Sequence, residues 1–132
     1  MIQLSPTTIA PPFARYAHGV IAEASGKMIA LSGQLGLAPD KTVPESAEAQ
    51  ARICLDNIDA ILAEAGASRR DILRLNAYVT DRAHLAAYMA ARDAWLVDMH
   101  TLPASTLMIV AGFAKPEFVV EVEALAMLPN TR

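Results

Sequence analysis

Two kinds of hydrophobic spacing run along the chain and predict most of its secondary structure. Residues 71–80 (DILRLNAYVT) alternate apolar and polar side chains, which is typical of a half-buried strand. Residues 45–65 instead repeat apolar side chains at helical spacing, and Gly66 follows as the expected end of that helix. Asp81 is placed to cap a second helix over residues 82–99.

Four further runs predict strands. Residues 18–24 and 27–37 alternate on either side of Ser25–Gly26, a short glycine-containing turn, so we expect them to form a β-hairpin. The runs 104–111 and 117–127 predict the last two strands. The proline-rich segment before the hairpin reads as an extended arm; its prolines are Pro6, Pro11 and Pro12.

The resulting order is β-β-α-β-α-β-β, which predicts an α+β domain with two helices on one side of a mostly antiparallel sheet. The 132 residues are the size of one domain, and we assign 1–132 to it. The chain is 54% hydrophobic, and some of that surface must be buried on the other face of the sheet. A second copy of the chain is the expected cover, which predicts a homo-oligomer.

Charge and cysteine content limit the classes of partner and the cellular compartment that we expect for this protein. The net charge of −3 and the pI near 5.5 argue against nucleic-acid and anionic-membrane partners. No apolar run reaches 18 residues without a charge or a proline, and the first 16 residues do not resemble a signal peptide. Cys54 has no second cysteine to pair with, which fits a reducing compartment, so a cytoplasmic protein is expected.

A search for chemistry leaves few candidates. His18, His84 and His100 fall in separate elements, so we predict no metal site, and Cys54 lies on the packed side of the first helix as an inert thiol. The GxxG of residues 33–36 is read as a β-bulge.

Two polar features need a reason. Glu121 and Glu123 are expected about 7 Å apart on one face of an otherwise apolar strand. They either form an exposed polar stripe, or one of them is a carboxylate that lines a pocket. Arg15 to His18 form a polar group before the first strand, either exposed on the surface or part of an arm over a pocket.

Several motifs together resemble one family over nearly the whole chain, in order and with similar spacing. They are Tyr16, Ser32-Gly33-Gln34, Leu55-Asp56-Asn57-Ile58, Tyr78-Val79-Thr80-Asp81, Pro103-Ala104 and Val120-Glu121-Val122-Glu123-Ala124. The sequence is similar to the RidA/YjgF family of reactive intermediate deaminases, also called L-PSP endoribonuclease-like. The resemblance implies a chorismate-mutase-like fold and a homotrimer with a central β-barrel and small-molecule pockets at the subunit interfaces. It also implies hydrolysis of enamines and imines such as 2-aminoacrylate, with no metal or cofactor.

One departure from the family pattern affects the expected substrate. The resemblance places a carboxylate-binding Arg directly after Pro103-Ala104, and this chain has Ser105 there. A Ser hydroxyl can donate a hydrogen bond but supplies no charge, so we expect weak or absent 2-aminoacrylate activity. At two other positions this chain also departs from the pattern that the resemblance implies: it has Met89 in place of an Asn and Leu107 in place of a Cys. Tyr16, Gly33 and Glu121 match that pattern.

These matches give the candidate site. We assign catalytic roles to Glu121 and Tyr16, and substrate binding to Arg15, Gly33, Ser105, Thr106 and Met89. Whether Arg15 replaces the missing Arg stays open, since neighbouring residues of an extended arm point opposite ways. Two functions also stay open: hydrolysis of a reactive intermediate other than 2-aminoacrylate, and a non-catalytic ligand-binding or chaperone-like trimer. Ribonuclease action is disfavoured by the acidic composition.

Overall fold

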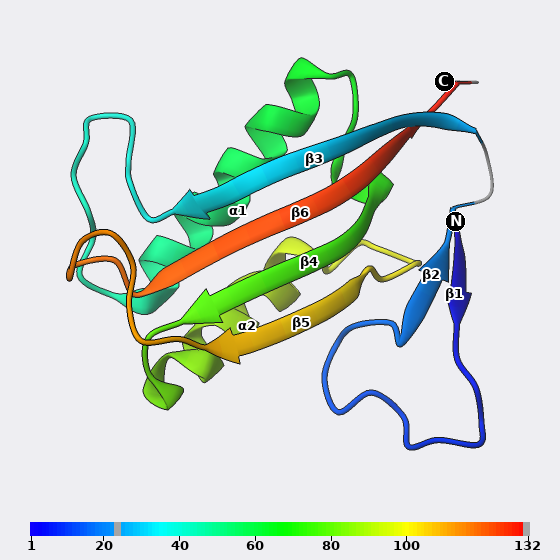
Figure 1. Ribbon diagram of the computed structural model, residues 1–132, viewed down its shortest axis with the longest axis horizontal. Helices are drawn as coiled ribbons and strands as arrows, with labels where there is room; N and C mark the ends of the chain where they lie inside the picture. The colour runs from blue at the N-terminus through cyan, green and yellow to red at the C-terminus, as the bar shows by residue number, and fades with distance from the viewer. Residues whose placement is uncertain (23–24, 131–132) are drawn as a thin grey trace.

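A four-stranded sheet forms one layer of the molecule (Figure 1). The computed structural model describes residues 1–22 and 25–130. The strand order is β3-β6-β4-β5, with β3 at Gly26–Leu35, β6 at Val120–Pro129, β4 at Ile72–Val79 and β5 at Ala104–Ile109. β6 is antiparallel to both of its neighbours, and β4 and β5 run parallel. The last strand of the chain therefore lies inside the sheet, between β3 and β4.

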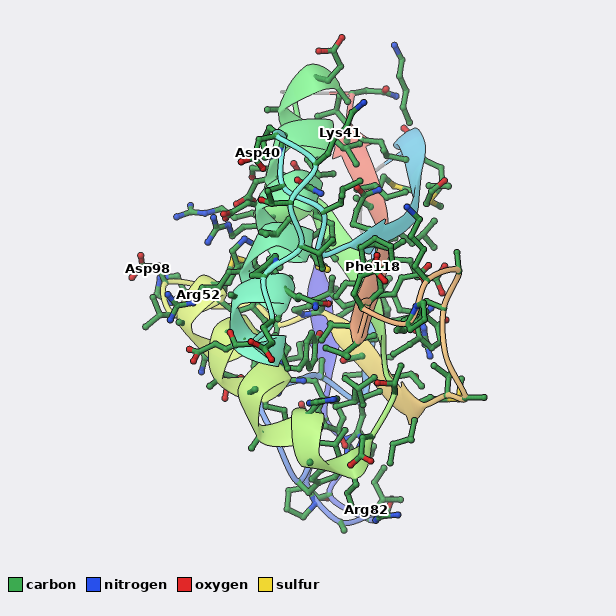
Figure 2. All side chains as sticks on the ribbon, turned by 90° about the vertical axis from the view of Figure 1, so that its left-hand side faces the viewer. Asp40, Lys41, Arg52, Arg82, Asp98 and Phe118 are labelled. Atoms are coloured by element: carbon green, nitrogen blue, oxygen red, sulfur yellow. The ribbon has the colours of Figure 1, made fainter. Side chains whose placement is uncertain are left out.

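Both helices cover the same face of this sheet, as the view in Figure 2 shows. α1 spans Ala47–Glu64, and its first turn is capped by the Ser46 side chain, which accepts a hydrogen bond from the Ala49 amide. Gly66 has a φ of 77°, so it supplies the left-handed residue that commonly follows a helix end. α2 spans Leu85–Trp95. The mixed α+β architecture with two helices on one side is thus confirmed.

The core lies between α1, α2 and the sheet. Its fully buried side chains include Cys54, Leu55, Ile58, Leu62, Leu75, Ala77, Val79, Tyr88, Leu96, Val120, Val122 and Ala126. From Leu75 to Val79 in β4 and from Val120 to Ala126 in β6 every second residue is buried here, and the alternate residues face the open side of the sheet. The open side carries apolar side chains such as Met28, Met108 and Met127 beside polar ones.

The predicted hairpin is wrong. β2 spans Gly19–Ile21 and pairs antiparallel with β1 at Ile2–Leu4, while β3 pairs with β6; the described residues contain no ladder between β2 and β3. Residues 23–24 of the predicted first strand lie outside the described residues. The physical reason is that alternation in an Ala-rich run defines faces but not a partner. The side chain of Gln3 also accepts from the Leu102 amide, which holds β1 beside the start of β5 (Figure 1).

Two further elements begin or end three or more residues from the predicted position, and the other boundaries of the long elements differ by at most two residues. The region from 82 to 99 begins with a 3₁₀ turn at Arg82–His84, capped by Asp81, and its α-helix ends at Trp95. Arginine side chains bind the carbonyls of Trp95, Leu96 and Met99, so the chain beyond the helix is stabilised without further helical turns. β6 starts at Val120 rather than at 117. The Gln50 side chain forms hydrogen bonds with the Glu117 carbonyl and the Val119 amide, so these two backbone groups do not pair with a neighbouring strand.

Candidate functional site

A hollow of about 220 Å³ lies where the N-terminal arm passes over α2 and β5. It is lined by Phe13, Ala14, Tyr16, Met89, Arg92, Ser105, Thr106 and Leu107. Four of the predicted site residues therefore lie together around one hollow: Tyr16, Met89, Ser105 and Thr106.

The arm is held over this hollow by backbone and aromatic contacts. The Ala17 amide donates to the Pro103 carbonyl at 3.0 Å, and Ala17 forms an isolated parallel bridge with Ala104. The Tyr16 ring packs edge-to-face against Phe13, with ring centroids 5.8 Å apart, and against His18 at 6.3 Å. These contacts hold Tyr16 beside the start of β5.

Glu121 and Gly33 lie elsewhere, on the open face of the sheet. The register between β3 and β6 shifts between Leu31 and Gln34, which confirms the predicted bulge. At Gly33 an added Cβ would lie 1.8 Å from Glu121 Oε1, so only glycine leaves the carboxyl group in this place. Burial, and secondarily the charge of Glu123, raise the pKa of Glu121.

Glu123 lies on the same face and accepts a hydrogen bond from a tyrosine. The Tyr78 hydroxyl donates a hydrogen bond to Glu123 Oε1, and this bond is the main cause of a raised pKa for Tyr78. Both carboxylates are half-buried and face the open side, as the alternation of β6 predicts. Glu121 has no such hydrogen bond within the described part of the chain, which leaves its oxygens available to a water molecule.

Ser105 and Glu121 lie on opposite faces of the sheet. Ser105 pairs in register with Leu75, whose side chain is fully buried under the helices, whereas Glu121 pairs with Tyr78 on the open face. β4 also lies between β5 and β6. A single copy of the chain therefore does not bring Glu121 and Gly33 to the hollow at Ser105.

Arg15 does not line the hollow in this conformation. Its Nη2 donates to the carbonyls of Leu96 at 3.1 Å and Met99 at 3.4 Å, which ties the arm to the chain after α2. The guanidinium is thus used by backbone acceptors that the helix end leaves free.

Arg92 lines the hollow and was missed by sequence analysis. It is 2% exposed, although arginine is seldom buried to this degree. A signal was present in the sequence: Arg92 follows Tyr88 by four residues and precedes Trp95 by three, which places it on the apolar side of α2.

Other candidate groups lie outside the hollow. Cys54 is fully buried, and burial raises the pKa of its thiol to about 12. The His18 ring binds the Ala10 carbonyl at 2.8 Å. Over residues 1–22 and 25–130, no group of three or more His, Cys, Asp or Glu side chains is arranged to hold a metal ion. Neither helix of that part has the length and hydropathy needed to cross a membrane.

The fold is a small α+β domain with a hollow at one side, and comparison with known proteins gives its family. Residues 7–128 match the family described as Endoribonuclease L-PSP. The 2-iminobutanoate/2-iminopropanoate deaminase of Escherichia coli K12 is 36% identical over 126 residues, covering 93% of this chain and 91% of the deaminase. The chain therefore belongs to the RidA/YjgF family.

Solved structures agree with this assignment. A Rid-family protein of unknown function, YyfB from Yersinia pestis, superposes with a TM-score of 0.84 at 30% identity, covering 96% of this chain and 97% of that one. Escherichia coli TdcF with bound serine superposes with a TM-score of 0.72 at 27% identity, covering 97% and 98% of the two chains.

Proposed function

We propose that this protein hydrolyses a small reactive imine or enamine in a pocket formed between subunits of a homotrimer. The observation that carries the proposal is the separation of the site in one copy: an arm-covered hollow at Ser105, and a carboxyl group of raised pKa at Glu121 on an open sheet face. Apposition of two copies is a way for one to supply Glu121 and Gly33 to the hollow of the next. The deaminase relatives support the reaction class.

In this proposal Glu121 acts as the general base. Water attacks the imine carbon as Glu121 takes a proton from it, and the resulting carbinolamine loses ammonia as its C–N bond breaks and a C=O bond forms. A carboxyl group with a raised pKa holds a proton closer to neutral pH, which suits it to take one and return it to the leaving nitrogen. Tyr16, held by its ring contacts, orients the substrate, and Ser105 offers a hydroxyl group to it. Thr106 contributes to the lining of the hollow, but its hydroxyl accepts a hydrogen bond from the Arg74 guanidinium.

The substrate is expected to differ from 2-aminoacrylate, because position 105 offers no charge to a carboxylate. A serine-bound structure of TdcF supports a small amino-acid-like ligand for this pocket. The competing function is ligand binding without turnover, which the same replacement at position 105 favours.

The test generates a series of 2-imino acids in the assay with an amino-acid oxidase. Their decay is then monitored by absorbance and by the release of ammonia. We expect the protein to accelerate the loss of at least one imine of the series, with only weak effect on 2-aminoacrylate made by a pyridoxal-phosphate dehydratase. Saturable binding with no acceleration for any imine of the series would instead establish the non-catalytic function. Strong acceleration of pyruvate formation from 2-aminoacrylate would show that another cation substitutes at position 105.

A further inference from the structure

The hollow at Ser105 contains one strong cation among its lining residues, Arg92 of α2. It lies beside Met89 in the lining, three residues further along the helix, so both point from one side of α2 toward β5. Its side chain is 3% exposed. A buried guanidinium is costly unless acceptors compensate its charge, so its described partners decide what it can bind.

Those partners compensate Arg92 only in part. Its Nε and Nη2 both donate to a single oxygen, Asp93 Oδ1, at 3.3 and 3.2 Å, which are long distances for a charge-assisted hydrogen bond. The Asp93 side chain is 46% exposed, so water screens it. A guanidinium carries five N–H donors, and these two bonds are the ones it makes to residues 1–22 and 25–130.

The second neighbour of Arg92 is also polar and incompletely paired. The Arg92 Cζ lies 5.7 Å from the centroid of the Tyr88 ring, in cation–π range. The Tyr88 hydroxyl is buried and has no hydrogen-bond partner among the described residues. Tyr88 does not line the hollow, so Arg92, a buried cation with unused donors that does line it, is the group that an anion there would satisfy.

We infer that Arg92 binds the carboxylate of a small 2-oxo or 2-imino acid in this hollow. The cation then comes from α2 instead of from the position after Pro103-Ala104, so the carboxylate sits against the helix beside Met89. The identity of the ligand class rests on the proposed function, but the binding of a carboxylate by Arg92 is independent of turnover.

The experiment measures binding of 2-oxobutanoate to the purified protein by calorimetry, with 2-butanone as the probe that lacks the carboxylate. We expect 2-oxobutanoate to bind and 2-butanone to bind at least tenfold more weakly. Arg92→Met keeps a long unbranched side chain but removes its charge, and it should weaken 2-oxobutanoate binding by about tenfold to a hundredfold. The matched control is Arg52→Met on the exposed side of α1, which should leave the affinity unchanged.

A second pair of variants decides the question if Arg92→Met does not fold. Ser105→Glu and Ser105→Gln have the same shape, and only the first brings a negative charge to the hollow. We expect Ser105→Glu to pair with Arg92, to melt at a higher temperature than Ser105→Gln, and to bind 2-oxobutanoate more weakly than it. Equal behaviour of these two variants would overturn the inference.

Two further outcomes also overturn it: no binding of 2-oxobutanoate by the wild type at 50 mM, or unchanged affinity in folded Arg92→Met. The proposed function fails separately. If Arg92-dependent binding is found but no imine is hydrolysed, the inference stands and the hydrolase proposal falls. If imines are hydrolysed at an unchanged rate and KM in Arg92→Met, the reverse holds.

Discussion

Glu121 combines three properties on one carboxyl group: it is half-buried, it lies over a glycine that leaves it space, and it shares a strand face with Glu123. Burial and the neighbouring charge disfavour its ionised form, so the folded protein holds the proton more tightly than the unfolded chain does. This contribution to stability is fully present at low pH and is lost as the pH rises through the raised pKa of the folded state.

Replacing Glu121 by Gln should therefore act in two ways. Any imine hydrolysis should fall by about 100-fold to 10,000-fold, because the proton acceptor is gone while the shape is kept. The urea midpoint should rise at pH 7 and stay unchanged at pH 4, since the cost of ionising the group has been removed. Glu64→Gln, on an exposed part of α1, should change neither quantity. Full turnover in Glu121→Gln would assign Glu121 a structural role only.

Cys54 gives a second prediction for a single residue. A thiol with a pKa of about 12 is ionised in about one molecule in 10⁴ at pH 8, and the Cys54 side chain is also out of reach of solvent. We expect Ellman's reagent to label native protein at least about 1,000-fold more slowly than protein in guanidinium chloride. Rapid labelling of the native protein would mean that α1 opens locally from the sheet.

Among the elements, the long ones could be predicted from the sequence and their partners could not. The helical spacing over 45–65 and the alternation over 71–80 each extend over enough residues to define a period, and both elements are present. The pairing of β2 was missed because alternation says which side of a strand is buried and is silent about its neighbour. The irregular stretch before β6 depends on one distant side chain, Gln50, which no local pattern shows.

Gln50 connects α1 to two loops. Its amide nitrogen donates to the carbonyls of Pro44 and Glu117 at 2.9 and 2.8 Å, and its oxygen accepts from the Val119 amide at 3.0 Å. Gly36 packs directly on this side chain, since a Cβ there would lie 2.5 Å from Gln50 Cβ.

Gln50→Leu should destabilise the protein by about 2–4 kcal/mol, because three backbone groups lose their partner beside a fully buried residue. Urea unfolding at fixed protein concentration measures this. The exposed Arg52→Gln, which breaks one surface ion pair with Glu48, should cost no more than about 0.5 kcal/mol. A loss below about 1 kcal/mol for Gln50→Leu would mean that water replaces the amide.

For the whole molecule, the candidate site could be predicted only in part. Matching residues to the family pattern named Tyr16, Met89, Ser105 and Thr106, which the fold places around one hollow. The same matching could not tell that Glu121 lies on the opposite face of the sheet from Ser105, because a set of matching residues carries no information on their positions in space. Arg92 was missed because attention went to position 105, where the resemblance implied a cation and this chain has a serine.

The open sheet face predicts the assembly. Met28 is 56% exposed and lies opposite Met127 on that face. Light scattering at micromolar concentration should give about three times 14.1 kDa. Met28→Glu should shift the mass toward a single chain, because a charge would be buried between copies.

Val97→Glu is the control for this assembly test. Val97 is 67% exposed just beyond the end of α2, so the mass should be unchanged. A wild-type mass of one chain would contradict the trimer and, with it, the proposed pocket between subunits.

The central place of β6 also has a consequence for synthesis of the chain. β3 ends at Leu35, but its sheet partner ends at Pro129, so 94 residues are translated in between. At about 5–20 residues per second this takes about 5–20 s, during which β3 and the β4–β5 pair cannot be joined. The nascent sheet therefore closes only when the last strand leaves the ribosome. The domain can complete its sheet only after β6 has been made, and until then the edges of β3 and β4 are open to pairing with other chains.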